Sequence, residues 1–100
     1  MKRGSTPTHT FNISLETSLI KEVKITYAQG DRIVLEKKAK DCEIKEGKIE
    51  LRLTQEDTFQ FDCTKPVYLQ LRALMLDGEC IPSDIMMTSV GKCLDDEVLV

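Results

Sequence analysis

Apolar and polar residues alternate along most of this chain, with the two-residue period of a β-strand. Phe11, Ile13 and Leu15 are apolar, and each is separated from the next by one polar residue. Successive side chains of a strand point to opposite faces, so this pattern predicts a strand with one buried face. Six later segments alternate in the same way or are short apolar runs, at residues 23–27, 33–35, 42–44, 49–53, 67–75 and 85–90.

Turn residues separate these segments at short intervals. Gln29-Gly30-Asp31 lies between the second and third segments, and Glu46-Gly47 lies between the fourth and fifth. Two apolar runs joined by so short a glycine-containing loop indicate a β-hairpin, so two hairpins are predicted. Asp77-Gly78 marks a further turn, and Pro82 is expected to end the short segment that begins at Cys80.

The alternation is interrupted once, between Thr54 and Phe61. Thr54 is followed three residues later by Asp57, which is the pattern of a helix N-cap. We therefore predict one helical turn near residues 54–59 that places Phe59 and Phe61 over the open edge of the core. This segment is expected to be a structural corner between strands.

Taken together, the pattern predicts a single all-β domain over residues 1–100. The expected fold is an antiparallel, immunoglobulin-like β-sandwich of about seven strands, and a small barrel is the alternative. Asp57, Phe61 and Cys63 have a spacing found before a late strand of immunoglobulin domains, but the chain has no Trp, and no Cys lies about 60 residues upstream to pair with Cys63. Residues 1–8 are expected to form a flexible arm, and residues 92–100 a tail.

Charge and hydropathy exclude some classes of partner. The chain has 14 basic and 17 acidic residues, mixed along its length, for a formal net charge of −3. Nucleic-acid-binding proteins usually carry a concentrated basic face, so no nucleic acid is expected as a partner. The apolar runs are far shorter than the roughly 20 residues of a membrane span, and no apolar segment follows the basic start Met1-Lys2-Arg3. We expect no membrane contact and no signal peptide.

No combination of residues points to a reaction, a cofactor or a metal. His9 is the only histidine, and it is expected to be a surface residue. Without a secretion signal, the four cysteines are expected to be reduced and mostly buried. Acidic pairs are interpreted as a helix cap at Glu56-Asp57 and as a solvated tail at Asp95-Asp96-Glu97. Catalytic, cofactor-binding and metal-binding residues are therefore predicted to be none, and no cofactor is expected.

Candidate contact residues lie at the ends of the chain and on two tyrosines. Val98, Leu99 and Val100 form an apolar end on an acidic stem, which could add to a neighbour's sheet or pack on its own domain. Thr8 and Thr10 belong to the threonine-rich start of the chain. Tyr27 and Tyr68 are the only plausible aromatic platforms for a ligand. Met86-Met87 is expected to pack in the core or at an edge.

Several segments together resemble a family of small proteins of about this length, encoded in prophages of Gram-positive gut bacteria, often among structural genes. The resemblance covers nearly the whole chain and is also, more distantly, to immunoglobulin-like modules of phage tails and baseplates. The segments that carry it are Arg3–Phe11, Leu53–Phe59, Leu69–Arg72 with Asp77-Gly78, and Ser83–Ile85 leading to Val90–Leu94.

This resemblance implies a non-enzymatic phage structural or virion-associated module, in a tail, baseplate or connector. Its partners would be other phage structural proteins and, as a homo-oligomer, further copies of itself. Its expected location is the host bacterial cytoplasm during assembly and then the virion. The alternative is a β-sandwich adhesin that binds a host surface or a carbohydrate, for which Tyr68 would supply the exposed aromatic ring. An enzyme is the third and least favoured class.

Overall fold

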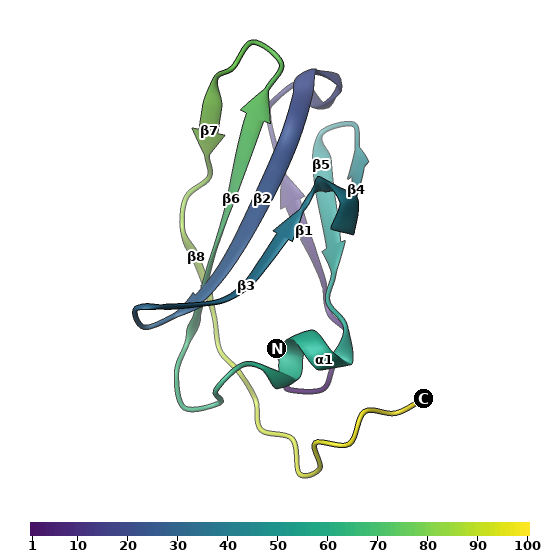
Figure 1. Ribbon diagram of the computed structural model, residues 1–100, viewed down its shortest axis with the longest axis vertical. Helices are drawn as coiled ribbons and strands as arrows, with labels where there is room; N and C mark the ends of the chain where they lie inside the picture. Colours follow the sequence, from purple (N-terminus) through teal and green to yellow (C-terminus); the bar gives the residue numbers. More distant parts are fainter.

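The computed structural model describes all 100 residues and contains two antiparallel β-sheets (Figure 1). The larger sheet is centred on β2 (Ile20–Gln29), which pairs with β3 (Arg32–Lys38) on one side and β6 (Val67–Met75) on the other. β2 and β3 form the first predicted hairpin. Gly30 in its turn has φ 58°, a left-handed conformation that glycine adopts without steric cost.

The smaller sheet has β5 (Lys48–Arg52) between β1 (Thr8–Asn12) and β4 (Cys42–Lys45). β4 and β5 form the second predicted hairpin. β1 ends earlier than the sequence predicts, because Asn12 pairs with Lys48, the first residue of β5, and only the Ile13 N–H still donates beyond it, to the Gly47 carbonyl in the turn. The chain then turns through a short 3-10 helix, η1 (Thr17–Leu19), into β2; a second one, η2 (Ala39–Asp41), joins β3 to β4.

The outer edge of β6 is covered by two short strands instead of one. β7 (Cys80–Pro82) pairs with one half of β6, and β8 (Met86–Thr88) pairs with the other half. Between them, Ser83 accepts a hydrogen bond from the Leu71 backbone N–H at its Oγ, at 3.0 Å. The last predicted strand, residues 85–90, is thus shorter than expected, and Pro82 ends β7 as the sequence predicts.

The strand order confirms the predicted sandwich. The small sheet has the order β1-β5-β4 and the large sheet β3-β2-β6-β7, with no strand pairing between the two. The absence of such pairing rules out the barrel. If β1 is taken as strand B, these orders are B-E-D and C′-C-F-G, which are those of an immunoglobulin-like sandwich without its first strand. The structure has eight strands where about seven are predicted.

The core fills the space between the inward faces of both sheets. Fifteen apolar residues are buried there, and the alternation predicts nearly all of them: Phe11, Val23, Ile25, Tyr27, Leu35, Ile49, Leu51, Leu53, Phe61, Val67, Leu69, Leu71, Ala73, Met75 and Val90. Burying a large apolar side chain contributes about 1.5–3 kcal/mol each, so these residues supply the main stabilisation of the fold.

One polar contact joins the two sheets inside this core. Tyr27 on β2 has its hydroxyl 2.7 Å from Nδ1 of His9 on β1, and its ring centroid lies 5.9 Å from that of Phe61. Burial and the charge of the N-terminus lower the pKa of His9, and burial raises the pKa of Tyr27. Both groups are therefore neutral at pH 7, and His9 is half-buried where a surface position is predicted.

The predicted corner is α1 (Gln55–Phe59), closed by a capping box between Thr54 and Asp57. Asp57 accepts a hydrogen bond from the Thr54 backbone N–H at 2.9 Å and lies 3.1 Å from Nζ of Lys37 on β3. Burial alone would raise the pKa of Asp57, but these contacts outweigh burial and keep the pKa below its ordinary value. As predicted, Phe61 covers the core, whereas Phe59 is only half-buried.

Both ends of the chain lie beside α1, at the end of the molecule away from the β6–β7 turn (Figure 1). Lys2 forms a parallel bridge with Gly91, and the Met1 amino group donates to the Ser89 carbonyl at 3.0 Å. The predicted flexible arm is thus bound to the domain in this structure, and it ends at residue 7 because Thr8 already pairs in β1. We call residues 1–7 the arm and residues 92–100 the tail.

Candidate interaction surface

Four apolar residues form a continuous row across the outer face of the large sheet. Ala28 on β2 is directly opposite Ile33 on β3 and Tyr68 on β6, and Tyr68 is directly opposite Met87 on β8. Side chains at directly opposed positions of antiparallel strands lie on the same face and touch. Ile33, Tyr68 and Met87 are 56%, 42% and 65% exposed, so the row faces solvent. We call it the apolar row.

A second row, four residues further along the strands, carries positive charge. Lys24 on β2 is directly opposite Lys38 on β3 and Arg72 on β6. Glu36 lies 3.5 Å from Lys24 Nζ and offsets one of the three charges. Like charges at directly opposed positions repel, so this basic row costs the fold stability instead of adding to it.

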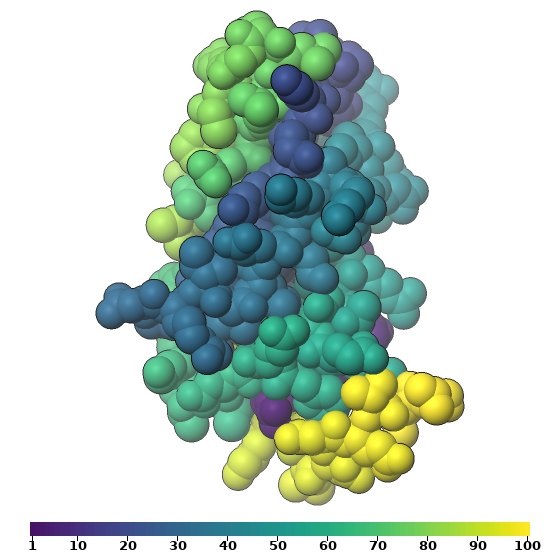
Figure 2. All heavy atoms as spheres, in the orientation of Figure 1, coloured from purple at the N-terminus to yellow at the C-terminus, as the bar shows by residue number.

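The tail is attached to α1 by hydrogen bonds between the side-chain amide of Gln55 and the backbone of Leu99. Gln55 Nε2 donates to the Leu99 carbonyl at 2.9 Å, and its Oε1 accepts from the Leu99 N–H at 2.9 Å. The side chain of Leu99 remains 74% exposed, Val98 is half-buried and Val100 is fully exposed. Figure 2 shows the tail in yellow as a layer on the surface beside α1.

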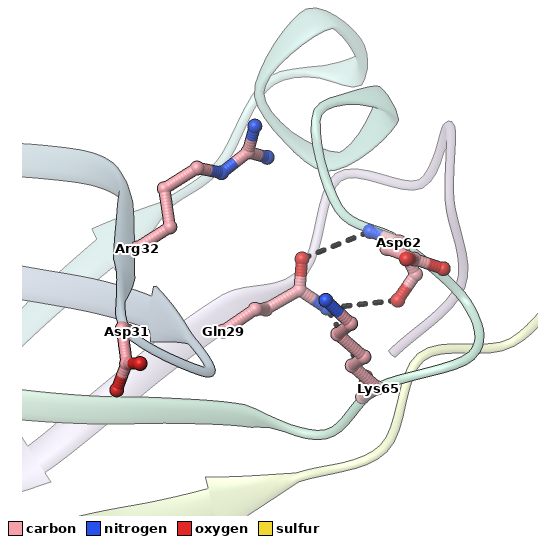
Figure 3. A pocket seen from close by; sticks show the side chains of 5 residues that line it. All are labelled: Gln29, Asp31, Arg32, Asp62 and Lys65. Carbon is pink, nitrogen blue, oxygen red and sulfur yellow. Dashed lines mark hydrogen bonds between the residues drawn. The ribbon is translucent and has the colours of Figure 1, made fainter.

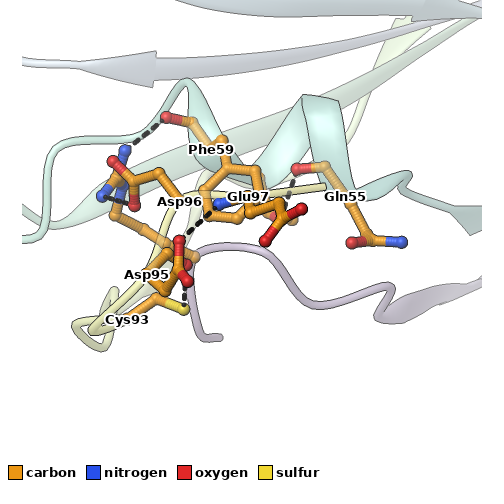
Figure 4. A network of polar contacts seen from close by, with 8 residues as sticks. Gln55, Phe59, Cys93, Asp95, Asp96 and Glu97 are labelled. Carbon is orange, nitrogen blue, oxygen red and sulfur yellow. Dashed lines mark hydrogen bonds and ion pairs between the residues drawn. The ribbon is translucent and has the colours of Figure 1, made fainter. Parts of the chain in front are cut away.

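Arg3 of the arm holds the acidic stem of the tail in place through Asp96 and Phe59, which are labelled in Figure 4. Its guanidinium donates to Asp96 and to the Phe59 carbonyl, both at 2.9 Å, and lies 5.5 Å from the centre of the Phe59 ring. Gly4 follows with φ 79°, and a Cβ there would come within 2.6 Å of the Phe59 ring. Only glycine therefore allows the arm to pass this close to α1. We call this group of contacts the clasp.

The other candidate contact residues have different outcomes. Thr8 and Thr10 are exposed on β1, opposite Arg52 and Glu50, so they are available to a partner. Tyr68 is exposed as a platform would be. Tyr27 is fully buried, and its prediction as a platform is wrong. It belongs to the inward-facing set of β2, and its hydroxyl is used by His9 inside the core.

A polar pocket of about 420 Å³ lies at the end of β2 (Figure 3). Gln29 is buried at its base and donates to the carbonyls of Asp62 and Lys65 at 2.8 and 3.1 Å, while its Oε1 accepts from the Asp62 N–H at 2.9 Å. Nε2 thus donates twice and Oε1 accepts once, so Gln29 ties the loop before β6 to β2. Asp31 and Arg32 line the other side of the pocket.

The cysteines are unpaired, as predicted, but none is fully buried. Cys42, Cys63 and Cys93 are half-buried and Cys80 is exposed. Each lies on an edge strand or in a loop, where only part of the side chain is covered. Met86 and Met87 lie on β8, an edge strand, which is one of the two expected placements, but both residues are exposed there. No group of three or more His, Cys, Asp or Glu side chains is arranged to hold a metal ion.

No family model, curated protein or solved structure matches this chain. None of its helices has the length and apolarity needed to cross a membrane. The class that the fold and its surface define is therefore only an antiparallel β-sandwich. The outer face of its large sheet carries the apolar row and the basic row. The sequence reasoning missed both rows of that face. Their residues are the outward positions of the same alternation, and the missing information was the register that aligns them across strands.

Proposed function

We propose that this chain is a non-enzymatic structural module of a phage particle, which makes protein–protein contacts in a tail, baseplate or connector. The resemblance to prophage-encoded proteins supports the setting, and the exposed apolar row supports the mode of action. The monomer is not stabilised by exposing Ile33, Tyr68 and Met87 to solvent. Apolar surface of this kind is typical of interaction sites. The apolar row is the single observation on which the proposal depends.

The partners in this proposal are other particle proteins and further copies of the chain. Assembly would take place in the host cytoplasm before the module becomes part of the virion. Four free cysteines fit that setting, because reducing compartments keep thiols unpaired. His9 has a structural part in this view, since its ring joins the two sheets through Tyr27.

Quantitative mass spectrometry of purified particles tests the proposal. The prophage would be induced and particles banded by density, with an uninduced culture processed in parallel. We expect this chain to be enriched with the capsid and tail proteins at a constant copy number per particle. Enrichment no greater than that of abundant host proteins would reject the proposal.

A carbohydrate-binding adhesin is the second candidate, because Tyr68 presents an exposed aromatic ring beside Met87. Aromatic rings on an outer face can stack on sugar rings. A glycan array would then show binding that Tyr68→Ala removes and Leu76→Ala, a change at another exposed apolar residue, retains. An array without any binding would leave the structural module as the only supported function.

A further inference from the structure

The tail and the outer face of the large sheet carry complementary chemistry in the same order. The tail has the acidic residues Asp95, Asp96 and Glu97, followed by the apolar residues Val98, Leu99 and Val100. The face has the basic row, followed by the apolar row. If the acidic stem lay opposite the basic row and the apolar end opposite the apolar row, charge would be neutralised and apolar surface buried in the same contact.

The spacing of the two surfaces also agrees. Along β2, Lys24 of the basic row and Ala28 of the apolar row are four residues apart. In the tail, Asp96 and Val100 are four residues apart as well. An extended chain and a strand rise by about the same 3.3 Å per residue, or roughly 13 Å over four residues. An extended tail laid along the strands therefore places acid on base and apolar on apolar.

The clasp and Gln55 hold the tail in place but leave its side chains accessible to a partner. Gln55 holds the backbone of Leu99, whereas the side chains of Leu99 and Val100 point into solvent. Asp96 contacts Arg3 but keeps a side chain that is 62% exposed. A tail held in place on its own domain loses less conformational freedom when it binds a neighbour, so its contacts yield more net affinity.

From these observations we propose that the tail of one copy docks on the outer face of the large sheet of a second copy. The inference rests on the proposed function, because it names a further copy of the chain as one of the module's partners. The contact is head to tail: the surface used on one copy differs from that used on the next. Such contacts close into rings or continue as filaments, whereas a face-to-face contact would stop at a dimer.

Complementation between two variants tests the contact. The face variant carries Tyr68→Ser and Met87→Ser, and the tail variant carries Leu99→Ser and Val100→Ser. Leu76→Ser is the control, because Leu76 is an exposed leucine outside both surfaces. Each protein is studied as the full chain by analytical ultracentrifugation at concentrations up to about 1 mM, a range that detects weak contacts. Thermal melting checks that each variant stays folded.

We expect the wild type and the control to self-associate and each variant alone to be monomeric. An equimolar mixture should form dimers and nothing larger, because the face variant keeps its tail and the tail variant keeps its face. A wild type that stays monomeric would overturn the proposal. So would self-association of the tail variant alone, since that would indicate a face-to-face contact.

A charge exchange provides an independent second test. Lys24→Glu with Arg72→Glu, or Asp95→Lys with Asp96→Lys, should each abolish self-association, and mixing the two proteins should restore it. Wild-type association should also weaken when NaCl is raised from about 50 mM to 500 mM, because salt screens exposed charges. Failure of the exchanged pair to associate would reject the predicted alignment. Particle mass spectrometry stays independent: a monomeric chain still found in particles would retain the proposed function and reject only this contact.

Discussion

The two tyrosines of this protein lie on paired strands, at positions that differ by one residue in the ladder, and their side chains point to opposite faces of the sheet. Tyr27 on β2 is opposite Leu69 on β6, and Tyr68 is opposite the next residue of β2, Ala28. Tyr27 is fully buried between the sheets, whereas Tyr68 is 42% exposed on the outer face. A shift of one residue changes the face of a side chain, so parity along the strand separates a core residue from a contact residue.

The same difference holds for the two faces of the large sheet as a whole. The inner face is mostly apolar, with Gln29 and Lys37 among its polar positions, and is covered by the small sheet. The outer face groups its apolar and its basic residues into separate rows, and this grouping adds nothing to the packing of the monomer. A sheet that needed only to fold would not require such an outer face, which is why we assign stability to the inner face and contacts to the outer one.

Replacing each tyrosine in turn by alanine should give the largest difference in the free energy of unfolding. Tyr27→Ala is expected to lower the free energy of unfolding by about 3–5 kcal/mol, because it leaves a cavity beside Phe61 and an unpaired His9. Tyr68→Ala should change it by about 0.5 kcal/mol or less, as is usual for surface substitutions. Urea unfolding measures both. Equal losses would contradict the division between an inner and an outer face.

A smaller difference in stability is expected between substitutions of Asp57 and Glu56, two neighbouring acidic residues of α1. Asp57→Ala should cost about 2 kcal/mol, because it opens the capping box and leaves Lys37 without its partner. Glu56→Ala, one residue earlier and exposed, is the matched control and should cost about 0.5 kcal/mol or less. The same urea titrations measure these values. A cost for Glu56→Ala as large as that for Asp57→Ala would show that the helix needs general negative charge and not this pair.

The burial of His9, next to the charged N-terminus, should make stability depend on pH. The pKa of His9 is lowered from 6.5 in the folded protein, so below about pH 6.5 the unfolded chain binds a proton that the folded chain does not. Stability contributed by the neutral ring is present above pH 6.5 and is lost as the pH falls through the folded pKa. Melting temperatures between pH 7.5 and 5 measure this. The slope should flatten in His9→Gln, and an unchanged slope would assign it to other groups.

Loss of the tail should have the smallest effect on folding. Deleting residues 95–100 removes the Arg3–Asp96 ion pair and the Gln55–Leu99 bonds, which are exposed to solvent. Exposed contacts of this kind contribute about 1 kcal/mol or less, so the melting temperature should fall by only a few degrees. Self-association should be lost in the same sample. A large fall in melting temperature would instead make the tail part of the core.

Local patterns predicted most of the fold. The strand Val67–Met75 and the capping box at Thr54 are found where the alternation and the cap signal place them. Both signals depend on residues close together in sequence, so no knowledge of tertiary structure is needed. The cysteines were expected to be buried, but their burial depends on which strands become edges, and that is decided by the whole sheet.

The contact surface was harder to predict because it depends on register between strands. The apolar row forms only because β2 and β3 shift register between Tyr27 and Ala28, which brings Ile33 opposite Ala28. Nothing near Ile33 in the sequence indicates that shift. The role of Tyr27 was missed for a similar reason. A tyrosine is buried readily only when its hydroxyl finds a partner, and here the partner is His9 on the other sheet.

The interruption between β7 and β8 affects how readily the edge of the large sheet can pair with other chains at high protein concentration. A long, flat edge strand is a template for the growth of amyloid, because its free N–H and C=O groups can pair with any extended chain. Here the edge beside β6 is divided into two three-residue strands with Pro82 and Ser83 between them, and the opposite edge, β3, is bulged and ends in Lys37-Lys38. Neither edge offers a long run of free groups. The edges of the large sheet are therefore poor templates for amyloid growth when many copies are close together.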